Sequence, residues 1–262
     1  MKTLLKAAAV GVALIAAGIG LLFYATSGMV DTADQFFTAA KQHRYQRAYQ
    51  YLSRDFQAST SRAELEAFLQ QSALQDYQAA SWSSRSYSIG GGELGGTVTT
   101  SGGGTVPLRV RFVKENGDWK IYAIHKPPSG LIRDDNAAPP IPDKARQLQL
   151  VQQTMERFAR AINAKDFHDF HQHISGVWQR EISAARFNEI FKPFMDANLD
   201  LTPLQNLTPA MDKPASVNDK GVLTLEGHYP TKPSRVLFDF GYVYEGVSWK
   251  LVRTHVQITP AQ

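Results

Sequence analysis

Two related stretches decide the fold: VRFVKENGDWKIYAIHK, residues 110–126, and FGYVYEGVSWKLVRTHV, residues 240–256, which follows 130 positions later. The coincident residues are Trp119 and Trp249, Lys120 and Lys250, and His125 and His255. Both stretches are rich in β-branched and aromatic residues, and the first contains the turn signal Asn116-Gly117. The sequence therefore predicts two similar β-hairpins, one near the end of each half of the chain.

The residues upstream of these hairpins also repeat, with a shift of 122 positions. The segment from Gln35 is QFFTAAKQHRYQRAYQYLSRDFQASTSRAELEAFL, and the matching segment from Arg157 is RFARAINAKDFHDFHQHISGVWQREISAARFNEIF. The identities include Ser53 and Ser175, Gln57 and Gln179, Ser61 and Ser183, and Ala63 and Ala185. The shift increases from 122 positions in this segment to 130 in the hairpins, which requires only extra residues in a loop of the second half. Two matches in the same order indicate duplicated domains.

Each half is predicted to contain helices followed by an antiparallel sheet, which defines an α+β domain. The first helix has apolar residues at helical spacing after Asp31 or Thr32 as its expected cap. A second helix is expected at residues 45–52, and the capping box from Ser61 to Glu64 predicts a third. The expected strands are residues 105–114, 118–126, 221–229, 235–245 and 248–258. The glycine stretches at residues 90–96 and 101–105 are interpreted as hairpin connections.

The predicted domains occupy residues 31–127 and 146–260. Between them, residues 128–145 are rich in proline, charged and without periodicity, which is typical of an extended linker. The 262 residues, 43% of them hydrophobic, suffice for two modest cores. There is no cysteine, so disulfides, thiolate nucleophiles and Cys-ligated zinc are excluded.

Residues 1–30 are predicted to be a cytoplasmic stub and a transmembrane anchor. No charged residue lies between Ala7 and Val30, and about 20 apolar residues span a bilayer. Lys2 and Lys6 precede this run and Asp31 follows it, so the N-terminus is expected in the cytoplasm and the domains outside the bacterial inner membrane. A cleaved signal peptide is the alternative, although the apolar run is long for one.

The formal net charge is +4, and Lys and Arg are scattered among acids. A nucleic-acid binder would carry a clustered basic face, so we do not expect this chain to bind nucleic acid. The sequence indicates no oligomeric state.

Helices followed by a sheet that ends in Trp119-Lys120-Ile121 or Trp249-Lys250-Leu251 resemble the NTF2-like (cystatin-like, cone-shaped) superfamily. That resemblance implies helices packed on a curved antiparallel sheet in each domain. The superfamily includes ketosteroid-isomerase-like enzymes and the assembly proteins of conjugation and secretion machines. The layout of one anchor and extracytoplasmic domains is similar to the assembly proteins, but no functional motif of either group is present, and fold alone does not give function.

The candidate site residues are few. His168, His171 and His173 lie beside Asp166 and Asp169, which makes a metal site conceivable, but no known ligand spacing supports it, and we predict none. Strict alternation places Trp119, Ile121, Ala123 and His125 on one face of a strand, and Trp249, Leu251, Arg253 and His255 on one face of another. Arg253, His255 and His125 are then candidate ligand-binding residues at the wet ends of strands whose tryptophans lie in the cores.

No catalytic constellation and no cofactor motif are found. We expect a non-enzymatic envelope protein that binds other envelope components or acts as an assembly scaffold. The alternative is a small-ligand-binding or isomerase-like enzyme that uses one cone as its pocket. A deep pocket with buried ionisable groups would favour the enzyme, and a cone filled by aromatic side chains would favour the scaffold.

Overall fold

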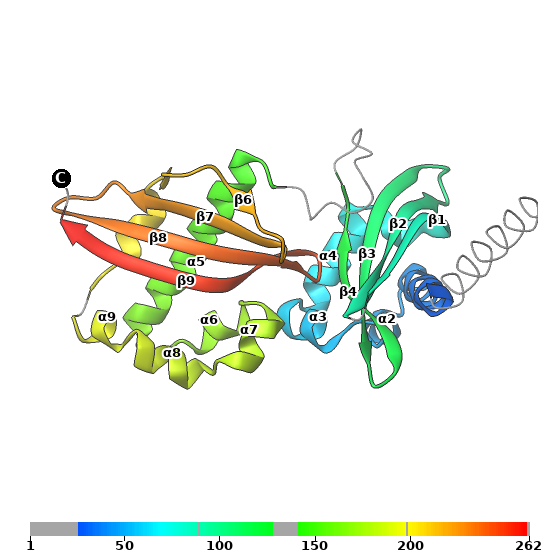
Figure 1. Cartoon of the computed structure of the whole chain (residues 1–262), viewed down its shortest axis with the longest axis horizontal. Coiled ribbons are helices and arrows are strands. Elements are labelled where there is room, and N and C mark those ends of the chain that lie inside the picture. The colour runs from blue at the N-terminus through cyan, green and yellow to red at the C-terminus, as the bar shows by residue number, and fades with distance from the viewer. Residues whose placement is uncertain (1–25, 89, 128–140, 198, 261–262) are drawn as a thin grey trace, which may run out of the picture. The chain divides into compact units, whose positions relative to one another are not determined.

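The computed structural model describes residues 26–88, 90–127, 141–197 and 199–260 (Figure 1). The chain divides into two compact units: unit 1 is Met1–Ser53 with Arg62–Leu131, and unit 2 is Arg54–Ser61 with Ile132–Gln262. Each unit contains helices and an antiparallel sheet. The predicted α+β class is therefore confirmed.

Unit 1 begins, within the described residues, with a helix over residues 26–41. The elements that follow are α2 (Tyr45–Tyr49), α4 (Arg62–Gln71), η1 (Leu74–Asp76), β1 (Tyr77–Ser88), β2 (Gly91–Thr100), β3 (Thr105–Glu115) and β4 (Asp118–His125). The strands form a meander in the order β1-β2-β3-β4. One sheet face and the helices share the core, which includes Phe36, Phe37, Leu94, Val98, Leu108, Val110, Phe112 and Ile121.

Two details of unit 1 differ from the sequence prediction. Residue 26 is already helical and Thr32 donates its hydroxyl to the carbonyl of Gly28 at 2.8 Å, so neither Asp31 nor Thr32 caps the helix. The second difference is that most of residues 90–96 belong to strand β2 instead of a connection. At Gly96 an added Cβ would overlap the backbone of β1, lying 2.9 Å from the Cα of Trp82, so glycine permits the close pairing.

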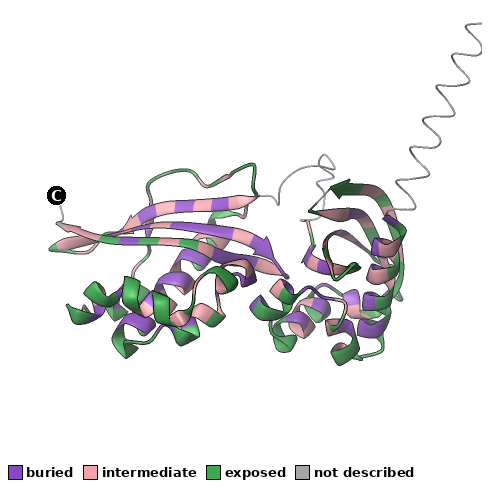
Figure 2. Ribbon diagram, turned by 60° about the horizontal axis from the view of Figure 1, so that its bottom comes forward, coloured by how far each residue is buried: buried purple, intermediate pink, exposed green. Residues whose placement is uncertain are grey.

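Unit 2 places a long helix, α5 (Lys144–Ala164), across one face of its sheet (Figure 1). The other elements are α3 (Arg54–Ser59), α6 (His168–Gln172), α7 (Gly176–Glu181), α8 (Ala184–Ile190), α9 (Lys192–Asp196), η2 (Thr202–Asn206), β5 (Ala210–Met211), β6 (Ser216–Val217), β7 (Val222–Tyr229), β8 (Ser234–Glu245) and β9 (Ser248–Pro260). The sheet order is β5-β7-β8-β9, and β6 also pairs with β7. Burial alternates along β7 and β8, as Figure 2 shows, so one face of this sheet is covered and the other is open.

The helix α3 belongs to unit 2 although its neighbours in the chain belong to unit 1. Phe56 on α3 is completely buried. An added Cβ at Gly176 would lie 2.7 Å from the Cα of Asp55, so α3 and α7 approach closely because this position of α7 has no side chain. Asp55 also pairs with Arg180 of α7.

Backbone details recur at positions that the repeat makes equivalent. His43 and Lys165, 122 residues apart, both follow a long helix with φ of 54°. The N–H of Ser53 donates to the carbonyl of Ile121 at 2.8 Å, and the N–H of Ser175 donates to that of Leu251 at 2.9 Å. These local features support the predicted repeat independently of side-chain similarity.

None of the helices in the described part of the chain is both long enough and apolar enough to cross a membrane. The predicted anchor is residues 1–30, of which residues 1–25 lie outside the described residues. Residues 26–30 belong instead to the helix over residues 26–41, where Met29 is completely buried. Residues 128–140 of the predicted linker also lie outside the described residues. Helix α5 begins at Lys144, so the last two residues of the predicted linker are helical. The side chain of Asp143 caps this helix by accepting the N–H of Arg146 at 2.8 Å.

Candidate functional site

A β-bulge interrupts the predicted alternation in β4. Arg111 pairs with Ala123 and Phe112 pairs with Ile121, so Tyr122 is an extra residue. Residues directly opposite in an antiparallel pair share a face of the sheet. His125 is opposite Arg109 and therefore lies on the other face of the sheet from Trp119 and Ile121. The prediction that these three residues share one face was wrong, because one extra residue reverses the pattern beyond it.

The second unit has the same bulge 130 positions later. Tyr242 pairs with Leu251 and Gly241 pairs with Arg253, so Val252 is the extra residue. Arg253 and His255 lie on the open face of the sheet, opposite Gly241 and Asp239. They do not share the covered face of Trp249 and Leu251, which corrects the prediction for this strand as well.

The open face of this sheet carries a group of charged and polar side chains that we call the polar face of unit 2. Its members are Asp212, Lys213, Thr224, Glu226, His228, Asp239, Arg253 and His255. Arg253 Nη2 is 2.6 Å from Asp239 Oδ1, His228 Nδ1 is 2.8 Å from Asp212 Oδ1, and Lys213 Nζ is 2.9 Å from Glu226 Oε2. The acids of the polar face thus each have a basic or imidazole partner on a neighbouring segment.

The pairs of the polar face are exposed to solvent in part, with His228 the most covered member at 18% side-chain exposure. The side chains of Arg253 and Asp239 are 48% and 37% exposed, and that of Lys213 is 68% exposed. The hydrogen bond and charge of Glu226 raise the pKa of Lys213 above its usual value. Exposed pairs of this kind contribute about 0–1 kcal/mol each to stability. The fold therefore does not depend on the Arg253–Asp239 and Lys213–Glu226 pairs, and these are available for exchange with the charges of a partner.

His125 has a different environment in unit 1. Burial, and secondarily the positive charge of Arg109, lower the pKa of His125 to about 4. Arg109 itself is 3.8 Å from Glu93 on the neighbouring strand. The imidazole is therefore uncharged at neutral pH, and the prediction that it lies at a wet strand end was wrong. His255, by contrast, is exposed as expected.

The predicted cores differ in how deeply they bury their tryptophans. Trp249 is 8% exposed, which agrees with its assignment to the core. Trp119 is only half-buried, because it lies near the end of its strand among Tyr87, Phe112 and Lys114.

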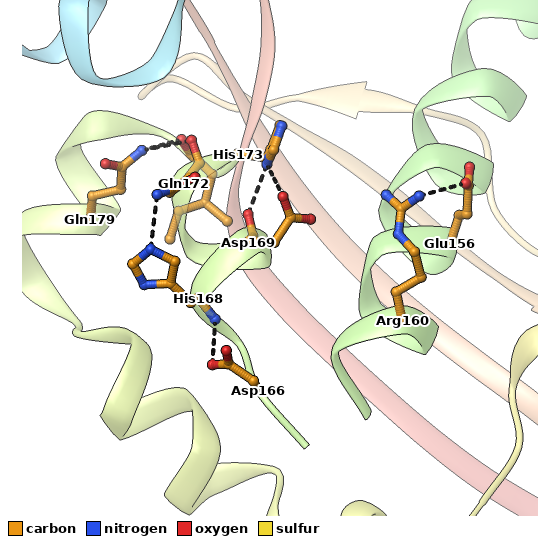
Figure 3. Close-up of polar contacts among 9 residues, drawn as sticks. Glu156, Arg160, Asp166, His168, Asp169, Gln172, His173 and Gln179 are labelled. Atoms are coloured by element: carbon orange, nitrogen blue, oxygen red, sulfur yellow. Dashed lines mark hydrogen bonds and ion pairs between the residues drawn. The ribbon is translucent and has the colours of Figure 1, made fainter. Parts of the chain in front are cut away.

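The histidines near α6 are engaged separately (Figure 3). His168 Nε2 lies 3.0 Å from the side-chain nitrogen of Gln172, and His173 Nδ1 lies 2.7 Å from the carbonyl of Asp169. His171 Nε2 lies 2.7 Å from the carbonyl of Ile182. Within the ranges that the structure describes, no group of three or more His, Asp or Glu residues is placed to hold a metal ion.

The covered side of unit 2 is filled by aromatic side chains. Phe158 of α5 makes edge contacts with Phe167, Phe170, Phe191 and Phe194. Tyr242 is buried, and its hydroxyl is 2.9 Å from that of Thr154. A cavity of about 20 Å³ lies between α5 and η2, lined in part by Met155, Ala159 and Leu201. It has room for about one water molecule, whereas ligand pockets measure roughly 300–1,000 Å³.

Sequence reasoning found Arg253 and His255 but missed their acidic neighbours. Asp239 lies between Phe238 and Phe240, and one acid between two aromatic residues of a strand is a signal that its side chain lies on the open face. Glu226 is the corresponding acid of β7.

The sequence was also compared with models of known protein families and with curated proteins. The described architecture consists of two α+β units, each with an antiparallel meander and helices on one side. Such an architecture agrees with an NTF2-like fold but is not specific to it. The assignment to that superfamily therefore stays a prediction. No family model and no curated protein matches the chain.

Proposed function

We propose that the chain is a non-enzymatic protein of the bacterial envelope, anchored in the inner membrane, whose two NTF2-like domains bind other envelope components. The polar face of unit 2 is the observation that carries this proposal. It is an open sheet surface with paired charges of both signs, which suits recognition of a protein partner with a complementary charge pattern.

The charges of the polar face support binding more than turnover. Catalytic acids and bases usually lie in a cleft that desolvates them and shifts their pKa values. Arg253 and Asp239 instead lie on an exposed sheet surface, where they form an ion pair. Arg253 Nη2 is also 3.4 Å from the hydroxyl of Thr224, so the guanidinium bridges three strands. A partner could replace either contact without loss of the fold.

The packing of unit 2 gives no support to the alternative of a ligand-binding or isomerase-like enzyme. That function requires a pocket with convergent polar groups beneath the sheet. In unit 2 this position holds Phe158, Phe240 and Tyr242, all buried.

Photo-crosslinking in the membranes of the native host tests the proposal. A photoreactive residue replaces Gln257, exposed on the same face of β9 as His255, in the full chain. The control replaces Gln149, which is exposed on α5. We expect one discrete adduct with an envelope protein from position 257 and none from position 149, and Arg253→Glu should weaken the adduct. Equal labelling from both positions would contradict a specific surface, and so would an adduct unaffected by Arg253→Glu.

A further inference from the structure

The first described residues of the chain pack against the ends of the unit 1 strands. Thr26 and Met29 are completely buried. An added Cβ at Gly28 would lie 2.8 Å from Cδ1 of Trp119, and Gly92 leaves space for the side chain of Met29. The helix over residues 26–41 is therefore fixed against the β1–β2 and β3–β4 hairpins at the point where the chain enters unit 1.

An aromatic and basic group surrounds this entry point. The ring of Tyr87 is 49% exposed and makes an edge contact with Trp119, with ring centroids 5.9 Å apart. Nζ of Lys114 lies 5.0 Å from the centre of the Trp119 ring. We call Tyr87, Lys114 and Trp119 the aromatic cap of unit 1. Tyrosine, tryptophan and lysine side chains of this kind favour the boundary between hydrocarbon and water.

The position of the cap along the chain relates it to the predicted anchor. Because Gly28 packs against Trp119 and Met29 against Gly92 in unit 1, the proposed membrane span would end before these residues. The 19 uncharged residues from Ala7 to Ala25 would span about 28 Å as a helix, close to the roughly 30 Å of a hydrocarbon core. Gly28 and its partner Trp119 then lie about one helical turn beyond the hydrocarbon boundary. The headgroup region there is roughly 5–8 Å thick.

The local charge indicates which property of the membrane is recognised. Glu115 and Asp118 lie on the same hairpin as Lys114 and Lys120, so the surroundings of the cap are not strongly basic. Attraction to anionic lipid requires clustered Lys and Arg. The aromatic rings, which need no lipid charge, are the better explanation for contact with a bilayer.

From these contacts we propose that the aromatic cap rests in the headgroup layer of the phospholipid bilayer and holds unit 1 at the membrane surface. The inference rests on the proposed anchor. Tyr87 and Trp119 would place their rings at the interface and Lys114 its ammonium group among the phosphates. The contact would fix the orientation of unit 1 on the membrane.

Single-cysteine labelling tests the contact, because the chain has no cysteine of its own. Ser88→Cys places a fluorophore beside Tyr87, and Ser101→Cys places one in the β2–β3 turn, at the far end of the ten-residue strand β2, roughly 30 Å away. The full chain is reconstituted in phosphatidylcholine nanodiscs with nitroxide groups near the lipid headgroup. We expect about twofold or greater quenching at position 88 and little at position 101.

Two further measurements separate the contact from the anchor. Tyr87→Ser in the Ser88→Cys chain should reduce the quenching, and its partial exposure makes this a mild change to the fold. Vesicle flotation reports the anchor independently. If the chain floats but position 88 is quenched no more than position 101, the contact is refuted and the anchor stands. If the chain does not float with the vesicles, the anchor and the membrane contact of the aromatic cap are both refuted. Quenching that appears only with anionic lipid would overturn the role of the aromatic rings.

Discussion

The environment of His125 predicts a pH dependence of the stability of unit 1. Its pKa in the folded protein is about 4, below the ordinary value of 6.5, because the ring is buried and Arg109 lies opposite. The neutral imidazole therefore contributes to stability in full above pH 6.5. The contribution is lost as the pH falls from 6.5 toward 4, since the unfolded chain binds the proton more readily.

The size of this effect follows from the difference between the two pKa values. At about 1.4 kcal/mol for each factor of ten, the difference corresponds to about 3 kcal/mol. His125 is partly exposed, so solvent screening reduces the expected loss to roughly 1–2 kcal/mol. Replacement of His125 by glutamine, which does not titrate, should remove this loss of stability at low pH.

Hydrogen exchange of the full chain, followed on peptides from β3 and β4, measures the free energy of opening of unit 1 at pH 7.5 and pH 5. Wild type should lose stability at pH 5 relative to His125→Gln. The exposed, repeat-equivalent His255→Gln is the control and should leave the exchange of these peptides unchanged. An identical pH dependence in wild type and His125→Gln would refute the reasoning.

Three further predictions concern packing and the linker. Trp249→Ala should destabilise unit 2 by about 3–5 kcal/mol in thermal unfolding. Trp119→Ala should destabilise unit 1 by less, because Trp119 is only half-buried. Gly96→Ala should lower the melting temperature of unit 1 because its Cβ would overlap β1, while Gly102→Ala, with no atom within 4 Å of its Cβ, should not. Limited proteolysis should cut first within residues 128–140, as expected for a proline-rich linker, and an initial cut inside either sheet would contradict this.

The sequence predicted the later strands of each unit and missed the earlier ones for physical reasons. Strands β3, β4, β8 and β9 are rich in β-branched and aromatic residues, so their period of two was visible. Strands β1 and β2 are rich in serine and glycine, which have low strand propensity. Gly95 and Gly96 leave room for Ser84 and Ser81 of β1, and Gly92 leaves room for the side chain of Met29. These are tertiary contacts that no local sequence pattern predicts.

The site was predicted in part. Arg253 and His255 were identified, but their face was wrong because the bulge at Val252 cannot be read from alternation alone. The burial of His125 was missed for a similar reason. The bulge residues Tyr122 and Val252 occupy equivalent positions of the repeat but differ in residue type. The repeat could therefore have located one bulge from the other, but not either bulge from the sequence alone.

The two units keep their backbone features and differ in the charges on their open sheet faces. The bulge that turns His125 onto the open face of unit 1 also turns His255 onto that of unit 2. The residue opposite each histidine is an arginine, Arg109, in unit 1 and an aspartate, Asp239, in unit 2. The positive charge of Arg109 disfavours protonation of the partly buried His125. If the domains arose by duplication, their open faces diverged in charge while the bulge was retained, so we expect the two faces to bind different partners.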